Sequence, residues 1–127
     1  MKKQQNGNEL FSKEWKKYWK AVDDYLRETV NIDQRLKKGE ILPAAEIKQL
    51  LRENFGRYFK GEIDQKFIIS LGTRIYELCW ADIEGPELEK ILSVACSLDD
   101  VMAGISKQKS RGEIDQLIRY LFDQYLK

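Results

Sequence analysis

The sequence predicts an all-α protein, built as an antiparallel bundle of about five helices. Its 127 residues include only two prolines and eight glycines, which favours helices over a β fold rich in turns. In five segments, apolar side chains recur three and four residues apart, which is the spacing of one helix face. The connections between these segments are mostly short, as in bundles whose neighbouring helices run in opposite directions.

The N-terminal part of the chain is expected to hold a flexible tail, residues 1–8, ahead of a single helical domain, residues 9–127. The tail is polar and ends in Asn-Gly-Asn, a composition typical of frayed termini. The first helix follows and ends near Val30, and residues 31–42 are expected to form a connector with one short turn. The apolar stripe of the first helix consists of Phe11, Trp15, Tyr18, Trp19, Val22, Tyr25, Leu26 and Val30.

Proline and glycine mark the bounds of the next two helices. Pro43 is expected to open the second helix, because the first helical position needs no N–H donor. This helix ends near Lys60-Gly61, a cation followed by glycine. The third helix is expected from about Glu62 to Trp80.

The C-terminal third of the chain predicts two more helices. Glu84-Gly85-Pro86 breaks the apolar pattern and starts the fourth helix. The segment SKQKSRG, residues 106–112, is expected to be a loop, and the last helix runs from about Glu113 to Leu126. The stripe of the fourth helix consists of Leu88, Ile91, Leu92, Ala95, Leu98, Met102 and Ile105.

The composition argues against the common classes of enzyme. The chain contains no histidine, which is the commonest general acid–base group near neutral pH and a frequent metal ligand. Neither a GxGxxG nor a GxxxxGK[ST] phosphate loop occurs. Cys79 and Cys96 have no spacing known for zinc sites or disulfide frameworks. We therefore predict a non-enzymatic protein without a cofactor or a metal site. The alternative is a carboxylate enzyme, which needs two or more acidic side chains that converge in a pocket.

The same features predict where the protein is found. The two cysteines suit small buried side chains in a reducing compartment. No apolar run approaches the roughly 18–20 residues of a membrane span. The N-terminal segment MKKQQNGNEL also lacks the apolar core of a signal peptide. The expectation is a soluble, cytoplasmic protein that has no membrane partner.

The five letters GEIDQ occur twice, at Gly61–Gln65 and at Gly112–Gln116. An internal repeat is not supported, because the segments upstream of the two copies differ completely. We interpret GEIDQ as a helix start used twice. Glycine closes the preceding segment or caps the new one, and the glutamate and aspartate lie where exposed N–H groups and the helix dipole favour anions. A ligand loop is the alternative.

The segment KEWKKYWK, residues 13–20, mixes lysines with aromatic residues. On a helical wheel, Trp15 and Trp19 fall on the stripe that faces the core, and the lysines fall on the opposite, solvated side. The alternative is a nucleic-acid surface in which bases stack on the tryptophans. Its lysines are Lys13, Lys16, Lys17 and Lys20.

The formal net charge of +1 conceals an uneven distribution. Residues 1–60 hold 14 basic and 9 acidic side chains, whereas residues 61–100 hold 3 basic and 9 acidic ones. The acidic residues of the middle segment gather around the break between the third and fourth helices, and two of them, Glu89 and Asp100, share a helix face three turns apart. They form either an ordinary solvated face or a docking patch for a basic partner. The acidic residues concerned are Asp82, Glu84, Glu87, Glu89 and Asp100.

The third helix is apolar on two sides. Its main stripe includes Leu71 and Ile75, while Ile69, Tyr76 and Trp80 lie together on the opposite side. Such a helix is either central in its bundle or carries an exposed contact strip. If the strip is exposed, Tyr76 and Trp80 beside Asp82 and Glu84 have the composition of an interface hot spot. A homodimer would use the same strip.

The stretch LLRENFGRYFKGEIDQKFI, followed by a helix, by ELEKILSVACSLDDV and by GEIDQLIRYLF, resembles the colicin D immunity-like proteins of bacteria. The resemblance covers about residues 47–126 and includes the GEIDQKF segment between two helices. It implies an antiparallel helical bundle in the cytoplasm of a toxin-producing cell. It also implies that acidic side chains cover the basic active site of a toxin nuclease that cleaves tRNA.

These observations lead to two functional hypotheses. In the first, the chain is a protein-binding module, an immunity or antitoxin-like inhibitor that docks an acidic patch on a basic toxin nuclease. Its contact residues are Asp82, Glu84, Glu87, Glu89 and Asp100, with Tyr76 and Trp80 as aromatic anchors. In the second, the chain is a helical subunit of a ribonucleoprotein or DNA-binding complex and uses Lys13, Lys16, Lys17 and Lys20.

Overall fold

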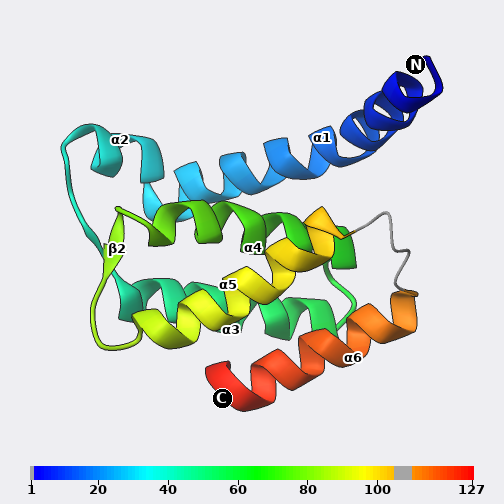
Figure 1. Cartoon of the computed structure of the whole chain (residues 1–127). Coiled ribbons are helices and arrows are strands. Elements are labelled where there is room, and N and C mark those ends of the chain that lie inside the picture. Colours follow the sequence, from blue (N-terminus) through cyan, green and yellow to red (C-terminus); the bar gives the residue numbers. More distant parts are fainter. Residues whose placement is uncertain (1, 105–109) are drawn as a thin grey trace.

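The computed structural model describes residues 2–104 and 110–127, with side chains from Trp15 onward. This part of the chain holds six α-helices, a C-terminal π-helical turn and two strands of two residues each (Figure 1). The all-α prediction is therefore confirmed. The elements are α1 Lys2–Val30, α2 Ile32–Lys37, β1 Leu42–Pro43, α3 Ala44–Phe59, α4 Gln65–Cys79, β2 Ile83–Glu84, α5 Leu88–Ala103, α6 Arg111–Leu121 and η2 Phe122–Leu126.

One pair of packed helices is parallel. The long helices α1, α3, α4, α5 and α6 alternate in direction along the chain, so α1 and α4, which pack on each other, run the same way (Figure 1). Two contacts between these helices show the common direction. The Lys66 ammonium lies over the Trp15 ring, and further along both helices Arg74 pairs with Asp23. Such a pair arises in a bundle of alternating helices when the first long helix packs on the third. The helix α3 lies between α1 and α4 in the chain and runs in the opposite direction. The helix α4 therefore starts at the end of the molecule where α1 starts.

The first helix is longer than predicted. It begins at Lys2, so residues 2–8, which we predicted as a flexible tail, continue the helix. Once a helix is nucleated, each further residue adds a hydrogen bond, and lysine and glutamine are good helix formers. The helix ends at Val30 because Asn31 adopts a left-handed conformation with φ 56°, which asparagine tolerates better than most residues.

The connector from 31 to 42 contains more structure than one turn. It forms α2, whose Arg35 donates to both carboxylate oxygens of Glu46 on α3, at 2.7 and 2.9 Å. Leu42 then pairs in parallel with Ile83 of β2. Pro43 lies in β1 and is the N-cap of α3. The helix begins at Ala44, one position later than predicted. The strand pair was not predicted, because two residues are too short for a periodic signal.

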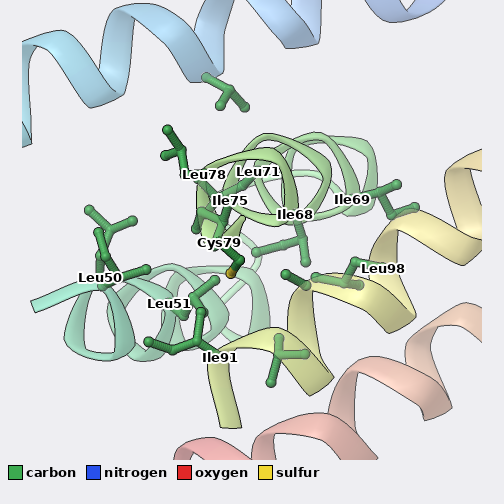
Figure 2. Packing of buried hydrophobic residues seen from close by; sticks show 14 of the residues in the cluster. Leu50, Leu51, Ile68, Ile69, Leu71, Ile75, Leu78, Cys79, Ile91 and Leu98 are labelled. Carbon is green, nitrogen blue, oxygen red and sulfur yellow. The ribbon is translucent and has the colours of Figure 1, made fainter. Parts of the chain in front are cut away.

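The core is centred on α4, which packs against α1, α3 and α5. Figure 2 shows Ile68 and Ile69 of α4 on the side toward α5, with Ile68 beside Leu98, and Leu78 on another side of the helix. Ile69 is buried. The two apolar sides of this helix therefore reflect, along most of its length, a central position in the bundle.

The C-terminal helix α6 continues into η2, which packs against α3 and α5. It starts at Arg111, two residues earlier than predicted, with Ser110 as its cap. The predicted loop 106–112 lies partly outside the described residues, which omit 105–109. Phe122 packs against Phe55 and Phe59 of α3, with ring centroids 6.4 and 5.3 Å apart. No helix within the described ranges is long and apolar enough to cross a membrane.

Candidate partner-binding surface

Trp80 is the most exposed large apolar side chain that the structure describes, with 69% of its surface open. It lies at the C-terminal end of α4, before the turn that leads to β2. Tyr76, one helical turn earlier, packs edge-on against the indole with ring centroids 5.6 Å apart. The i, i+4 spacing on a helix places the two rings together. The Trp80 ring is therefore exposed to solvent but held in place by its contact with Tyr76.

Acidic residues of α5 flank Tyr76. Burial raises the pKa of the Tyr76 hydroxyl, and the nearby Cys96, Asp99 and Asp100 raise it further. Asp100 is exposed and Asp99 is half-buried. The two helices approach closely here because α4 carries Gly72 opposite α5. Tyr76 thus lies within electrostatic range of Asp99 and Asp100.

The strand pair brings a further apolar residue to the same end of the molecule. The backbone N–H of Leu42 donates to the carbonyl oxygen of Asp82 at 2.7 Å, which places Ile41 beside the segment that follows Trp80. Ile41 is 44% exposed, Glu84 is exposed and Asp82 is half-buried. Sequence reasoning missed Ile41, because only the pairing of β1 with β2 brings it there. We define the Trp80 surface as Ile41, Tyr76, Trp80, Asp82 and Glu84, with Asp99 and Asp100 bordering it on the side of Tyr76.

The other two predicted contact residues, Glu87 and Glu89, lie at the start of α5. Glu87 is paired within the chain, with Lys48 of α3 at 3.4 Å and Lys90 at 3.5 Å. Burial acts to raise the pKa of Glu87, but the lysines outweigh it and the pKa is lowered. Glu89 is exposed in the first turn of α5. It lies about 16 Å along the helix axis from Asp100, at 1.5 Å per residue, and α5 begins at the end of the molecule where β2 lies (Figure 1).

The lysine face of α1 is exposed where the structure describes it. Lys16, Lys17 and Lys20 are open to solvent, Lys20 is paired with Asp24 at 2.9 Å, and the Lys13 side chain lies outside the described residues. Trp15 is buried as predicted, but Trp19 is 40% exposed, so its assignment to the core was wrong. The α4 residues near Trp19, Ser70 and Thr73, are too small to cover its ring.

The two GEIDQ copies meet at the opposite end of the bundle, around a polar cleft of about 490 Å³. All of Gly61–Gln65 lines the cleft, together with Arg111 and Asp115 beside and within the second copy. Gln65 donates to the carbonyl oxygen of Arg111 at 2.9 Å and to the hydroxyl of Tyr58 at 3.1 Å. The two GEIDQ segments therefore form part of one contact between the α3–α4 turn and the start of α6.

A hydrogen-bonded chain of side chains fills one side of this cleft. The Tyr58 hydroxyl donates to Asp115 at 2.7 Å, and Arg119 donates to the same carboxylate at 2.9 Å. These bonds lower the pKa of Asp115. Burial, followed by the bond to Asp115, raises the pKa of Tyr58. Because the donors and acceptors satisfy one another, we read the cleft as a structural junction.

Both GEIDQ copies lie at a helix start, as interpreted, but Glu62 and Asp64 precede the first turn of α4, and Gly112 lies inside α6. In the first copy, Gly61 ends α3 with φ 77° and Asp64 caps α4 by accepting from the N–H of Lys66. In the second copy, Ser110 is the cap, and Glu113 completes a capping box with it. The different registers explain why the sequences upstream need not match.

Comparison of the chain with protein-family models, curated proteins and solved structures yields no match. Among the described residues, no group of three or more cysteine, aspartate and glutamate side chains could hold a metal ion. The candidate site therefore rests on exposed aromatic residues and charge.

Proposed function

We propose that this chain is a non-enzymatic protein-binding module that docks a basic protein partner on the Trp80 surface. The exposure of Trp80 carries the proposal, since tryptophan is enriched among the residues that dominate interface energetics. The Tyr76 ring supports the indole, which reduces the ordering cost of an anchor on binding. Ile41 adds apolar area beside it.

The charge of this surface favours a basic partner. Glu84 and Asp100 are exposed, and Asp82 and Asp99 are half-buried. None of these four carboxylates has a side-chain ion pair or hydrogen bond among the described residues, in contrast to Glu87. Such a surface accelerates association with a positively charged partner and makes it salt-dependent.

We further propose that the partner is a toxin nuclease and that the chain acts as an immunity or antitoxin-like inhibitor in the cytoplasm of a bacterium. The resemblance of residues 47–126 to the colicin D immunity-like proteins supports this identification. A nuclease presents a basic active site to its nucleic acid, and acidic side chains around a tryptophan would complement such a site. A second copy of the chain is the competing occupant of the same surface.

The test is affinity capture with the tagged protein from a lysate of its source cells at low salt, followed by mass spectrometry. The expected result is a basic nuclease that the wild-type protein and Tyr120→Ala both retain and that Trp80→Ala loses. Tyr120 is a matched control because it is also an exposed aromatic residue, 54% open, on another helix. With the captured nuclease purified, Trp80→Ala should weaken binding by about 30-fold or more, typical of a hot spot.

Two results would overturn this proposal. One is a captured nuclease whose affinity is unchanged in both Trp80→Ala and the charge reversal Glu84→Lys/Asp100→Lys at low salt. The other is a dimer in sedimentation that dissociates with Trp80→Ala, which would assign the surface to a second copy.

The second candidate function is a helical subunit of a nucleic-acid complex. The observation that favours it is the exposure of Trp19 beside Lys16 and Lys20, which combines an aromatic ring with cations. Fluorescence anisotropy with a single-stranded RNA and a DNA oligonucleotide tests it. Binding that falls steeply with salt and is lost in Lys16→Glu/Lys20→Glu would support this function, and no binding at low salt would reject it.

A further inference from the structure

A groove of about 300 Å³ lies between α1 and α4, on the side where Trp19 is exposed. Its walls are mainly apolar, and at about 30 Å³ per water molecule it has room for roughly ten waters. This volume is at the lower end of the range for small-molecule sites. The residues that line the groove are Trp19, Val22 and Asp23 from α1 and Ser70, Thr73, Arg74 and Glu77 from α4.

Two hydroxyl groups beside the groove are unsatisfied. Ser70 is only 1% exposed, and neither its Oγ nor the Oγ1 of Thr73 has a hydrogen-bond partner among the described residues. A buried polar group without a partner is unfavourable, and each such group in a folded protein calls for an explanation. Helical threonine has two favoured χ1 positions, so a side-chain rotation can turn the Thr73 hydroxyl toward a ligand in the groove.

The rim of the groove has an excess of negative charge. Arg74 lies 3.3 Å from Asp23 and 3.4 Å from Glu77. One guanidinium therefore pairs with two carboxylates, which leaves one negative charge in excess. All three side chains are partly open to solvent. An indole face such as that of Trp19 also attracts cations. The charged and aromatic groups around the opening therefore both favour a positively charged ligand over an anion.

We propose that this groove binds a small aromatic amine that carries a hydrogen-bonding group on its ring. The ring packs between Trp19 and Val22, the ring substituent reaches the hydroxyls of Ser70 and Thr73, and the ammonium group lies at the rim beside Glu77. About ten non-hydrogen atoms match the volume. This ligand site is separate from the Trp80 surface and does not depend on the proposed protein partner.

The test is a titration of the ¹⁵N-labelled protein, followed by the backbone amide signals in two-dimensional NMR. Three probes share one phenol ring and differ in charge: tyramine is a cation, p-cresol is neutral and 4-hydroxyphenylacetate is an anion. We expect tyramine to shift the amides of Val22, Thr73 and Glu77, with a dissociation constant of about 1 mM for a ligand of this size. Binding of p-cresol should be about three- to fivefold weaker, and that of the anion weaker still.

Two variants separate the hydroxyl and charge contributions. Glu77→Gln should remove most of the advantage of tyramine over p-cresol, whereas Glu89→Gln on α5 should leave it unchanged. Ser70→Ala/Thr73→Val should weaken both ligands and leave the fold intact, because the hydroxyls that it removes bond to nothing among the described residues. The proposal is overturned if tyramine shifts none of the three amides, or if its advantage over the anion survives Glu77→Gln/Asp23→Asn in full.

Discussion

Gly72 shows how one residue sets the distance between two helices. It is buried in the middle of α4, where a β-carbon would overlap the side chain of Leu98 on α5. Glycine costs a helix interior about 1 kcal/mol relative to alanine, so its presence here is explained by the close approach of the helices. That approach brings Asp99 and Asp100 near Tyr76.

Gly72→Ala should therefore destabilise the protein by about 1–3 kcal/mol, the usual cost of an overpacked core. The matched control is Gly56→Ala in α3, where a β-carbon meets nothing within 4 Å. That change should be neutral or should stabilise the protein by up to about 1 kcal/mol. Urea unfolding measures both. A Gly72→Ala protein as stable as the wild type would show that α4 and α5 are not held this close.

The end of α4 provides a second prediction at this scale, about the two cysteines. Burial raises the pKa of the Cys79 thiol to about 11, so almost none of it is thiolate near neutral pH. Cys96 is half-buried on α5. Alkylation by iodoacetamide at pH 8, read by mass spectrometry, should therefore modify Cys96 first. Faster modification of Cys79 in the folded protein would contradict its burial.

At the scale of elements, the two GEIDQ copies illustrate how context assigns roles to identical letters. Gln65 is 7% exposed and bonds to Tyr58 and to the start of α6, whereas Gln116, the same letter of the second copy, is exposed. The first copy thus ties the α3–α4 turn to α6. The second copy supplies Asp115, which accepts from Tyr58.

Gln65→Ala should cost about 1–3 kcal/mol of stability, because it leaves a carbonyl oxygen and a hydroxyl with one partner fewer in a buried place. Gln116→Ala should stay within about 0.5 kcal/mol of the wild type, as exposed substitutions usually do. Denaturant midpoints of the two variants provide the comparison. Equal effects would mean that the junction between the copies contributes no stability.

At the scale of the whole molecule, several carboxylates link folding stability to pH. Burial acts to raise the pKa of Asp64, but the N–H of Lys66 and the hydroxyl of Tyr18 lower it overall. Tyr58 and then Arg119 lower that of Asp115. A carboxyl whose pKa is lower in the folded state stabilises the fold above its unfolded pKa, near 3.9. This contribution disappears as the pH falls through the folded-state pKa.

Stability should thus hold between about pH 5 and 7 and decline below about pH 4. Asp115→Asn should be less stable than the wild type at neutral pH, and the difference should shrink as the pH falls, because the wild-type carboxyl becomes protonated. Glu89→Gln, an exposed change on α5, serves as the control. Urea unfolding at a series of pH values measures the effect. A difference that stays constant into strong acid would exclude Asp115 as a contributor to the pH dependence.

The charge distribution is also a property of the whole molecule that chain segments describe incompletely. Counted along the sequence, Glu87 belongs to the acidic middle segment, yet in space Lys48 of α3 neutralises it. Asp100 lies near the end of α5, away from β2 (Figure 1), and acts electrostatically on Tyr76. Glu87 is therefore less available to a basic partner than its place in the acidic segment indicates.

The sequence by itself determined the helical class, most helix ends and the identity of the core stripes. These features follow from local rules: apolar spacing, proline and glycine at ends, and capping residues that bond to the nearest N–H groups. The tertiary structure alone decided that α1 and α4 run in parallel, that Ile41 joins Trp80, that Trp19 is exposed and that the GEIDQ copies meet. Each of these depends on which elements become neighbours, and that choice is made by the packing of all side chains at once.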